Sequence, residues 1–451
     1  MRFSMNTTLT TNPVLRITVL CVLYLAQGIP HGFVTIALSV WFVTQGVDVD
    51  GIAQLATAAV LPWSFKWAWG PVVDRYQIRR YGRRRPWILF AQSLMILSAG
   101  SLLLVDDPVA QISTVASIIF IHNLFSGLQD VSVDALAVDL LAPEQRGRAN
   151  GLMYGSKYLG TSIGGAGLSV VLVKLGFDAA VLTMCGLLGL IMLVPLFIRE
   201  RPGEQRLPFG DHSSGHLVED ASELEERSAN ASFLTLVLRL LKSFGHRNTL
   251  LAIALAFLVW IPNGMTYPVG LVLFMNDLGW EQLEYSRLTG TWGIGAALLG
   301  SVAGGFIADR IGARRLAAIA ASAYAALFCV PGACPIAWLE HTGFASTYIV
   351  VTDLVQGTLS VSLFAIFMSV SWKIVAATQF TAYMAMLNLS YSVGAMIAPT
   401  FEEYEWAYWQ IYLLAAAVQI CVLAILPFCT PTDSKRTSVE PLDPDANLGE
   451  P

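Results

Sequence analysis

Charged residues are scarce in this chain of 451 residues, in which Asp, Glu, Lys and Arg together make up 13%. An ordinary soluble protein has about 25%. The net charge of −5 provides no basic surface, so we expect no nucleic-acid partner. The six cysteines lie in or beside apolar runs without the spacing of metal ligands, so we expect no metal site. No phosphate-binding loop with a following lysine is present, and we expect no cofactor.

Long apolar runs fill the space between the few charges. Crossing about 30 Å of hydrocarbon takes roughly 20 apolar residues, so these runs are typical of transmembrane helices. The sequence predicts an all-α membrane protein with twelve transmembrane helices in two pseudo-symmetric six-helix bundles. The predicted spans lie near residues 14–43, 51–73, 86–105, 110–141, 148–173, 179–198, 249–275, 284–308, 316–338, 345–371, 379–401 and 408–428.

A polar stretch between the sixth and seventh spans divides the chain. We expect an N-terminal bundle over 1–198, a cytoplasmic linker over 199–248 and a C-terminal bundle over 249–429. The linker begins acidic and ends in Phe233–Phe244, whose apolar residues face Arg239 and Lys242 as in a helix lying on a membrane surface. The tail over 430–451 has a composition typical of disorder.

Lysine and arginine gather on one side of the predicted membrane. The turns after spans two, four and eight carry them, whereas the turns on the other side have few. Because basic loops stay in the cytoplasm, both termini are expected there.

One pattern, Gly…Asp-Arg…Gly…Arg-Arg, closes the second span of each half. Duplicated halves are typical of transporters, and the acid and the arginines can pair as a latch that breaks when the halves rock. A simple basic turn is the alternative. The residues of this predicted cytoplasmic gating motif are Gly70, Asp74, Arg75, Gly82, Arg83, Arg84 and Arg146 in the first half, and Gly305, Asp309, Arg310, Gly312 and Arg314 in the second.

Four ionisable residues lie inside the first six spans, namely Lys66, Asp130, Asp134 and Lys157. Each costs roughly 2.5–3.5 kcal/mol at the centre of a membrane helix, so they must be paired or hydrated. Counting helical rise from the span ends predicts the pairs Lys66–Asp134 and Lys157–Asp130, lining a polar cavity. Either substrate or a proton competes for these charges, or the pairs only hold helices together.

The second half carries fewer polar groups inside its spans. We predict that Asn263, Tyr267, Asp353, Gln356, Asn388 and Tyr391 complete the substrate and coupling cavity. Aromatic and amide groups suit sugar-like solutes, although tyrosine is also common at membrane interfaces. Proline and glycine near Pro30 and Pro262 are expected to loosen spans one and seven, or to make ordinary kinks.

These motifs resemble those of the major facilitator superfamily, and in particular its AmpG-type muropeptide permease and acetyl-CoA transporter branch. The resemblance rests on Gly28-Ile29-Pro30, Phe65-Lys66-Trp67-Ala68-Trp69-Gly70-Pro71, Asp74-Arg75-Tyr76, Gly82-Arg83-Arg84-Arg85, Gln129-Asp130, Asp134-Ala135, Asp139, Pro143-Glu144-Gln145-Arg146-Gly147 and Ala377-Thr378-Gln379-Phe380. It implies a secondary transporter of a muropeptide or a related sugar conjugate in a bacterial inner membrane. Glycosides and acyl-CoA compounds are the alternatives, since the arginine run also resembles that of glycoside symporters.

The function predicted is therefore alternating-access transport of a medium-sized polar or amphiphilic solute, with import driven by protons. Its partners would be the lipid bilayer, a small-molecule solute and protons, and we expect a monomer. A membrane-embedded enzyme built on Asp130 and Asp134 is one rival. Against it, lysines at matching depth are expected to pair with those carboxylates, and no nucleophile accompanies them. A solute sensor that does not transport is the other.

Overall fold

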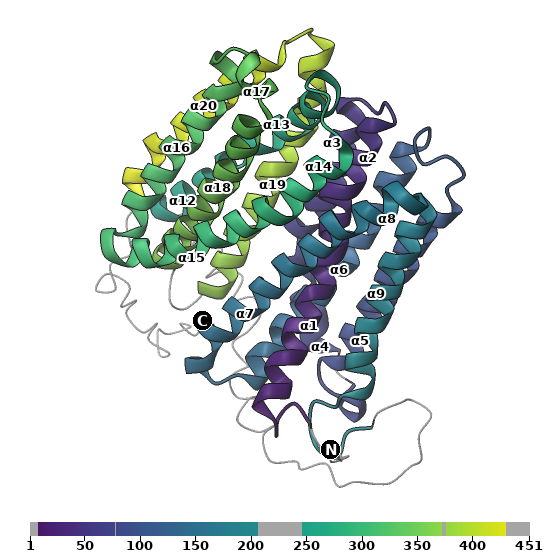
Figure 1. Ribbon diagram of the computed structural model, residues 1–451. Coiled ribbons are helices and arrows are strands. Elements are labelled where there is room, and N and C mark those ends of the chain that lie inside the picture. The colour runs from purple at the N-terminus through teal and green to yellow at the C-terminus, as the bar shows by residue number, and fades with distance from the viewer. Residues whose placement is uncertain (1–7, 77, 206–245, 372–375, 430–451) are drawn as a thin grey trace, which may run out of the picture.

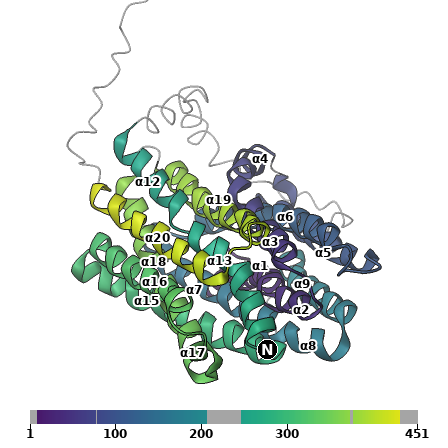
Figure 2. The ribbon, with the colours of Figure 1, turned by 90° about the horizontal axis from the view of Figure 1, so that it is seen from above.

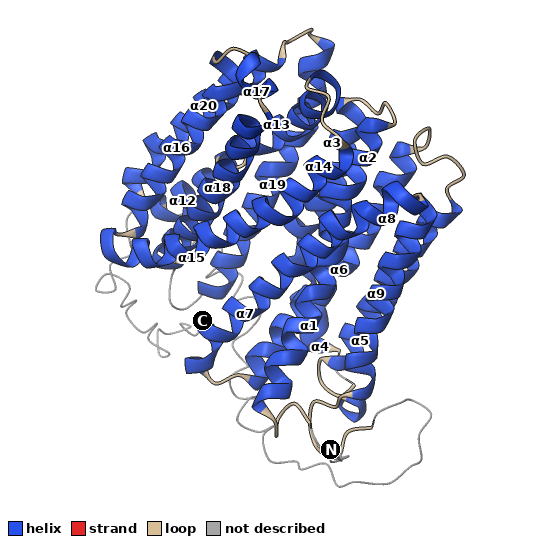
Figure 3. Cartoon of the chain, viewed as in Figure 1, coloured by secondary structure: helices blue, strands red, loops and turns tan. Residues whose placement is uncertain are grey.

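The structure is a computed structural model and describes residues 8–76, 78–205, 246–371 and 376–429. Every regular element in these ranges is a helix (Figure 3). The first bundle contains α1 (Pro13–Gly32), α2 (Ser39–Thr44), α3 (Val49–Val60), α4 (Trp69–Arg75), α5 (Arg85–Gly100), α6 (Ile112–Leu140), α7 (Pro143–Ser162), α8 (Leu168–Leu175) and α9 (Phe177–Phe197).

The second bundle contains α12 (Arg247–Leu258), α13 (Ile261–Val272), α14 (Gln282–Arg287), α15 (Ile294–Ile311), α16 (Ala313–Ala333), α17 (Ala337–Glu340), α18 (Thr342–Val370), α19 (Ala376–Glu403) and α20 (Tyr408–Ile425). Short π-helical segments are η1 (Phe33–Leu38), η5 (Ile163–Gly167), η6 (Leu273–Asp277) and η7 (Leu288–Gly293). The 3₁₀ segments are η2 (Leu61–Ala68), η3 (Arg79–Tyr81), η4 (Ser101–Leu104) and η8 (Leu426–Phe428).

Ten helical segments within the described ranges are long and apolar enough to cross a membrane. The other two predicted spans, 51–73 and 379–401, fall on α3–η2–α4 and on α19. The first of these is divided by the 3₁₀ segment η2, so no single helix runs through it. The all-helical membrane fold is confirmed, and the count of twelve spans stays a prediction.

The two bundles lie side by side in both views (Figures 1 and 2). They pack against each other mainly through α19 on α3 and η2, and through α13, η6 and α14 on α2, α3 and α8. One apolar core cluster includes Phe33 and Phe42 of the first bundle together with Phe274 and Trp280 of the second. The bundles are therefore closed against each other at the end opposite the arginine-rich turns, which we call the outer end.

Matching glycine pairs bring two helices into close contact in each bundle. A Cβ placed on Gly160 of α7 would lie 3.0 Å from the Cα of Gly28 in α1. A Cβ on Gly394 of α19 would lie 3.0 Å from the Cα of Gly264 in α13. Small residues allow membrane helices to approach this closely. Gly160 therefore allows α7 to pack closely on α1, and the same contact recurs in the second bundle.

The first helix of each bundle is interrupted along its length. Pro30 lies inside α1 and is followed by the π segment η1, whereas Pro262 is the second residue of α13, which starts after α12 has ended at Leu258. Both spans thus depart from a regular α-helix near the prolines that were expected to loosen them. Such local departures from α geometry are common where membrane helices line a functional site.

Several expectations concern residues outside the described ranges. The acidic part of the linker, the surface helix over Phe233–Phe244 and the tail over 430–451 all lie there. The predicted domain boundaries therefore stay predictions.

Candidate functional site

An ion pair inside the first bundle joins Lys66 to Asp130. The Lys66 Nζ lies 2.9 Å from Asp130 Oδ2, and the two side chains are 20% and 6% exposed. The predicted partners were different, with Lys66 assigned to Asp134 and Lys157 to Asp130. Both predicted pairs are wrong.

The observed helix ends explain the difference. Asp130 lies ten residues before the end of α6 at Leu140, which corresponds to about 15 Å. Lys66 precedes Arg75, the last residue of α4, by nine residues. Because its 3₁₀ segment rises about 2.0 Å per residue, Lys66 also lies about 15 Å deep. Lys157 lies fourteen residues into α7, about 21 Å from its start, and is too deep to pair with Asp130.

Asp134 has a tyrosine as its partner. The hydroxyl of Tyr24 in α1 donates a hydrogen bond to Asp134 Oδ1. Asp130 and Asp134 share one face of α6 at i,i+4 spacing. On that face Lys66 pairs with Asp130, and Tyr24 donates to Asp134. The sequence alone did not single out Tyr24, which looks like an ordinary apolar position in span one.

Lys157 rests on an aromatic ring. Its Nζ lies 4.4 Å from the ring centre of Trp63, within the range of a cation–π contact. The indole Nε1 of Trp63 donates to Asn123 Oδ1 at 3.0 Å, which fixes the ring beneath the ammonium. No carboxylate lies within ion-pair distance of Lys157 in the described part of the chain. We call Lys66, Asp130, Asp134 and Lys157 the charged cluster.

The second-bundle candidates fall into two groups. Asn263 Nδ2 donates to the Tyr324 hydroxyl at 2.8 Å, and the Tyr267 hydroxyl donates to the carbonyl of Thr35 at 2.6 Å. The second bond crosses between the bundles, from α13 to η1. The rings of Tyr267 and Tyr391 lie 6.3 Å apart. These residues thus gather where the bundles meet.

The other second-bundle candidates form no side-chain hydrogen bond or ion pair with any residue that the structure describes. They are Asp353 and Gln356 of α18 and Asn388 of α19, and each is half-buried. Asp353 lies beside Gly293 of η7, where a Cβ would collide with its carboxylate oxygen. A half-buried carboxylate without an internal partner is available for a proton or a ligand.

In the first bundle, the gating motif forms a compact ion-pair network. Arg84 is only 4% exposed and contacts Asp74 at 2.7 Å and Asp139 at 2.9 Å. Arg83 lies 3.7 Å from the other oxygen of Asp139. The network joins α4, the following turn and the end of α6. The sequence motif did not include Asp139, although the family resemblance did.

The second copy of the motif is arranged differently. Asp309, Arg310 and Arg314 are exposed, and none of them forms an ion pair within the described ranges. Gly312 has a φ of +89° and ends α15. A Cβ at Gly70 or Gly305 would meet no atom within 4 Å, and Arg75 forms no ion pair with a described residue. The side chain of Arg146 is not among those that the structure describes. The repeated sequence therefore builds an ion-pair network only in the first bundle, as far as the described residues extend.

A buried glutamate clamps the start of α5. The Glu200 carboxylate accepts the backbone N–H groups of Arg83 at 3.0 Å, Arg84 at 2.9 Å and Arg85. Gly82 has a φ of +111°, and a Cβ there would lie 2.8 Å from Glu200 Oε1. A glycine is therefore needed for the turn to close around the carboxylate.

Arg85 adds a second set of contacts, in which a side chain donates to backbone carbonyls. Its guanidinium is buried and donates to the carbonyls of Pro195, Leu196 and Gln205, the first two in the last turn of α9. Burial raises the pKa of Glu204, which lies beside Glu200, to about 7. Glu204 is therefore partly protonated near neutral pH, and its repulsion of Glu200 is reduced. Neither glutamate was predicted, since both lie in what looks like the start of the linker.

Replacing Glu200 with alanine should lower the free energy of unfolding by about 1–3 kcal/mol, because three buried N–H groups would lose their acceptor. A lower midpoint of thermal unfolding in detergent would show this. Glu284→Ala is the matched control, since Glu284 is exposed in α14. Equal melting of Glu200→Ala and the control would contradict the clamp.

The fold and the charged cluster define a membrane transporter made of two helical bundles. The sequence model of the Major Facilitator Superfamily matches residues 19–267 and 252–447. The chain belongs to this superfamily.

Several relatives support this assignment. The chain is 23% identical to the anhydromuropeptide permease of Escherichia coli (strain K12) over 420 residues, which cover 91% of this chain and 79% of the permease. It is 24% identical to putative transporter AmpG 4 of Rickettsia conorii over 298 residues, or 64% of this chain and 67% of that protein. Within the superfamily, the chain is therefore similar to AmpG-type transporters.

Solved structures share the fold at low sequence identity. A D-xylose–proton symporter matches with a TM-score of 0.67 and 13% identity, covering 93% of this chain and 98% of the symporter. A POT family transporter in complex with a thioalcohol-conjugated peptide matches with a TM-score of 0.68 and 12% identity, covering 93% and 97%. These structures show that the fold is shared. Membership of the superfamily makes the chain an integral membrane transporter of a small-molecule solute.

Proposed function

We propose that the protein imports a muropeptide or a related sugar conjugate by alternating access, with protons as the coupling ion. The observation that carries this proposal is the charged cluster, where the ammonium of Lys157 rests on an aromatic ring and has no described carboxylate within ion-pair distance. An ammonium inside a membrane protein is costly unless it is hydrated or meets an anion. A solute with a carboxylate and a sugar ring supplies both an anion for Lys157 and a surface for Trp63.

The choice of muropeptide rests on similarity as well. A permease named for anhydromuropeptides is 23% identical over 91% of this chain. Glycosides and acyl-CoA compounds are the alternative solutes. A sensor that binds the solute without moving it is the alternative activity.

Two carboxylates support coupling to protons. Asp353 has no internal partner in the described ranges, and Asp134 is bonded to Tyr24, not to a lysine. A carboxylate that no cation holds can exchange a proton as its surroundings change, whereas one paired with lysine stays ionised. In this proposal the Lys66–Asp130 pair opens during the cycle and Asp134 or Asp353 takes up the proton.

The proposed setting is a bacterial inner membrane, with both termini in the cytoplasm and the protein acting as a monomer. The arginine-rich turns, with Arg84 in its network, would then face the cytoplasm. The outer end, closed by Tyr267 and the apolar cluster, would face away from it. This arrangement corresponds to an inward-facing state.

Counterflow in proteoliposomes tests the proposed function. Vesicles loaded with unlabelled anhydromuropeptide should accumulate labelled anhydromuropeptide from outside, and a pH gradient should drive net uptake. Binding without exchange would indicate a sensor instead. Exchange of glycosides or CoA esters but not of the muropeptide would overturn the substrate assignment.

Replacing Lys157 with alanine should reduce uptake about 10- to 100-fold, since losing a hydrogen bond to a charged group costs about 1.5–3 kcal/mol. Initial uptake rates per folded protein measure this effect. Lys174→Ala is the matched control, because Lys174 is exposed in the last turn of α8 and should transport normally. Normal uptake by Lys157→Ala would contradict its role in anion binding.

A further inference from the structure

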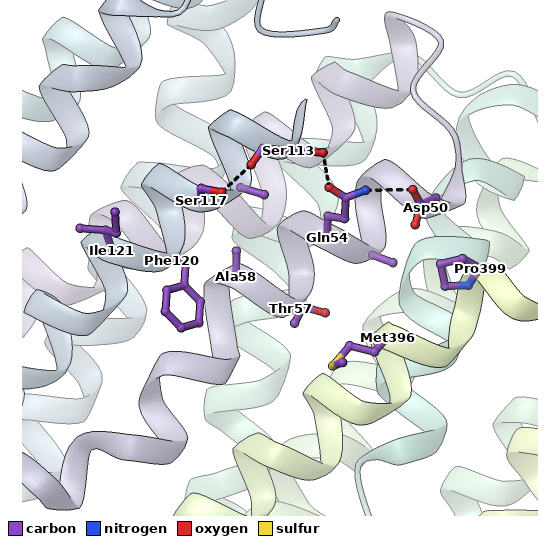
Figure 4. Close-up of a pocket in the computed structure, with 12 residues that line it drawn as sticks. Asp50, Gln54, Thr57, Ala58, Ser113, Ser117, Phe120, Ile121, Met396 and Pro399 are labelled. Atoms are coloured by element: carbon purple, nitrogen blue, oxygen red, sulfur yellow. Dashed lines mark hydrogen bonds between the residues drawn. The ribbon is translucent and has the colours of Figure 1, made fainter. Parts of the chain in front are cut away.

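A pocket of about 600 Å³ lies between α3 and α6 of the first bundle and α19 of the second (Figure 4). None of its lining residues belongs to the charged cluster. Most of its wall is apolar, from Ala53, Ala58, Phe120, Met396 and Pro399. The pocket is therefore separate from the transport site proposed above.

One end of the pocket is polar and carries a negative charge. Asp50 lies in the first turn of α3, and its Oδ2 accepts a hydrogen bond from Gln54 Nε2 at 2.9 Å. The Ser113 hydroxyl donates to Gln54 Oε1 at 2.8 Å, which continues the chain of bonds seen in Figure 4. No cationic side chain of the described ranges pairs with Asp50. The carboxylate is thus oriented by Gln54 and remains uncompensated.

The pocket opens towards the lipid. Ile121 and Met396 on its wall are 46% and 57% exposed. Ile121 belongs to α6, which is long and apolar enough to cross a membrane, and Met396 belongs to α19 of the second bundle. Large apolar side chains exposed at this depth contact acyl chains. Asp50 lies in the first turn of α3, at the outer end, and the ends of membrane helices lie at the depth of the lipid headgroups. The pocket therefore matches a lipid in both respects, with an apolar body in the hydrocarbon and a charged end at the headgroups.

We propose that this pocket binds one phospholipid with a free ammonium headgroup, whose acyl chain fills the apolar wall and whose ammonium pairs with Asp50. The acidic end favours such a lipid over an anionic one, which Asp50 would repel. Phosphatidylethanolamine has this chemistry. Phosphatidylcholine does not donate hydrogen bonds, because methyl groups surround its nitrogen.

Binding of the lipid would also depend on the conformation of the transporter. Its pocket has walls from both bundles, with α3 and α6 on one side and α19 on the other. When the outer ends separate, α19 moves relative to α3 and the pocket loses its shape. A lipid bound here therefore stabilises the state in which the outer ends are closed.

Native mass spectrometry of protein released from nanodiscs tests the site. Wild-type protein should retain phosphatidylethanolamine in preference to phosphatidylcholine with the same chains. Asp50→Asn, which keeps the shape of the side chain, should reduce that retention about three- to fivefold. Ala58→Phe fills the pocket and should reduce retention of either lipid. Asp178→Asn, at an exposed acid in the first turn of α9, should retain lipid as wild type does.

Thermal melting in the two kinds of nanodisc provides a second readout. Wild type should melt higher with phosphatidylethanolamine than with phosphatidylcholine, and Asp50→Asn should lose the difference. Equal retention of both lipids by wild type, or unchanged retention by Asp50→Asn, would overturn the proposal. So would a retained molecule whose mass matches neither lipid.

Discussion

Replacing Asp130 with asparagine should abolish uptake while the protein still reaches the membrane. Lys66 would lose its partner at 2.9 Å, and breaking a buried ion pair by removing one partner costs about 3–5 kcal/mol. The freed ammonium would then turn towards Asp134 and disturb its bond with Tyr24. We expect uptake to fall at least about 100-fold, measured as the initial rate per folded protein in proteoliposomes.

A double variant separates a functional pair from a static one. Lys66→Met with Asp130→Asn removes both charges together, so neither is left buried alone. If the pair only holds helices together, the double variant should recover uptake as well as stability. If the pair opens during transport, melting should recover and uptake should stay lost, which is the result we expect. Asp178→Asn serves as the control for loss of an exposed carboxylate.

Replacing Gly160 or Gly394 with valine should prevent the protein from folding normally. At each position a Cβ would meet the Cα of the facing glycine at 3.0 Å, and backbone atoms cannot turn aside as a side chain can. Overpacking of this kind costs about 1–3 kcal/mol, and more where backbone must move. The yield of monodisperse protein after detergent extraction measures the effect, and both variants should lose most of it.

Glycines without close neighbours provide the controls. Gly155 in α7 and Gly295 in α15 have no atom within 4 Å of a Cβ. Alanine at either position should be tolerated, and its higher helix propensity should stabilise the helix by up to about 1 kcal/mol. If valine at Gly160 and Gly394 were tolerated too, the matched contacts would not determine how α1 packs on α7 and α13 on α19.

The all-helical membrane fold and the position of the buried charges could be predicted from sequence. Apolar runs of sufficient length determine spans because the bilayer has a fixed thickness. The cost of burying charge singled out Lys66, Asp130, Asp134 and Lys157, and Lys66 and Asp130 do pair.

The pairing itself could not be predicted because it depends on where helices end and on their local geometry. The 3₁₀ rise of η2 and the early end of α6 at Leu140 move Lys66 level with Asp130. Because α7 starts at Pro143 and not at residue 148, where the predicted span began, Lys157 lies deeper than expected. Tyr24 gave no signal, because a tyrosine in an apolar run is as common at a membrane interface as in a site.

Glu200 was missed for another reason. A carboxylate just after a span looks like part of a solvated linker, and only the folded turn around Gly82 brings it onto the start of α5. For the repeated Gly…Asp-Arg motif, the sequence predicted more contacts than the described residues make. Its two copies predicted equal networks, yet ion pairs form around Asp74 and none of the described residues pairs with Asp309.

The bond from Tyr267 to the carbonyl of Thr35 has a consequence for how such closures evolve. A main-chain carbonyl is present whatever amino acid occupies position 35, so selection on the bond acts on the tyrosine and on the backbone path of η1. Homologous sequences should therefore carry no covarying residue pair at 35 and 267. Contact inference from coevolution would overlook this meeting point of the two bundles.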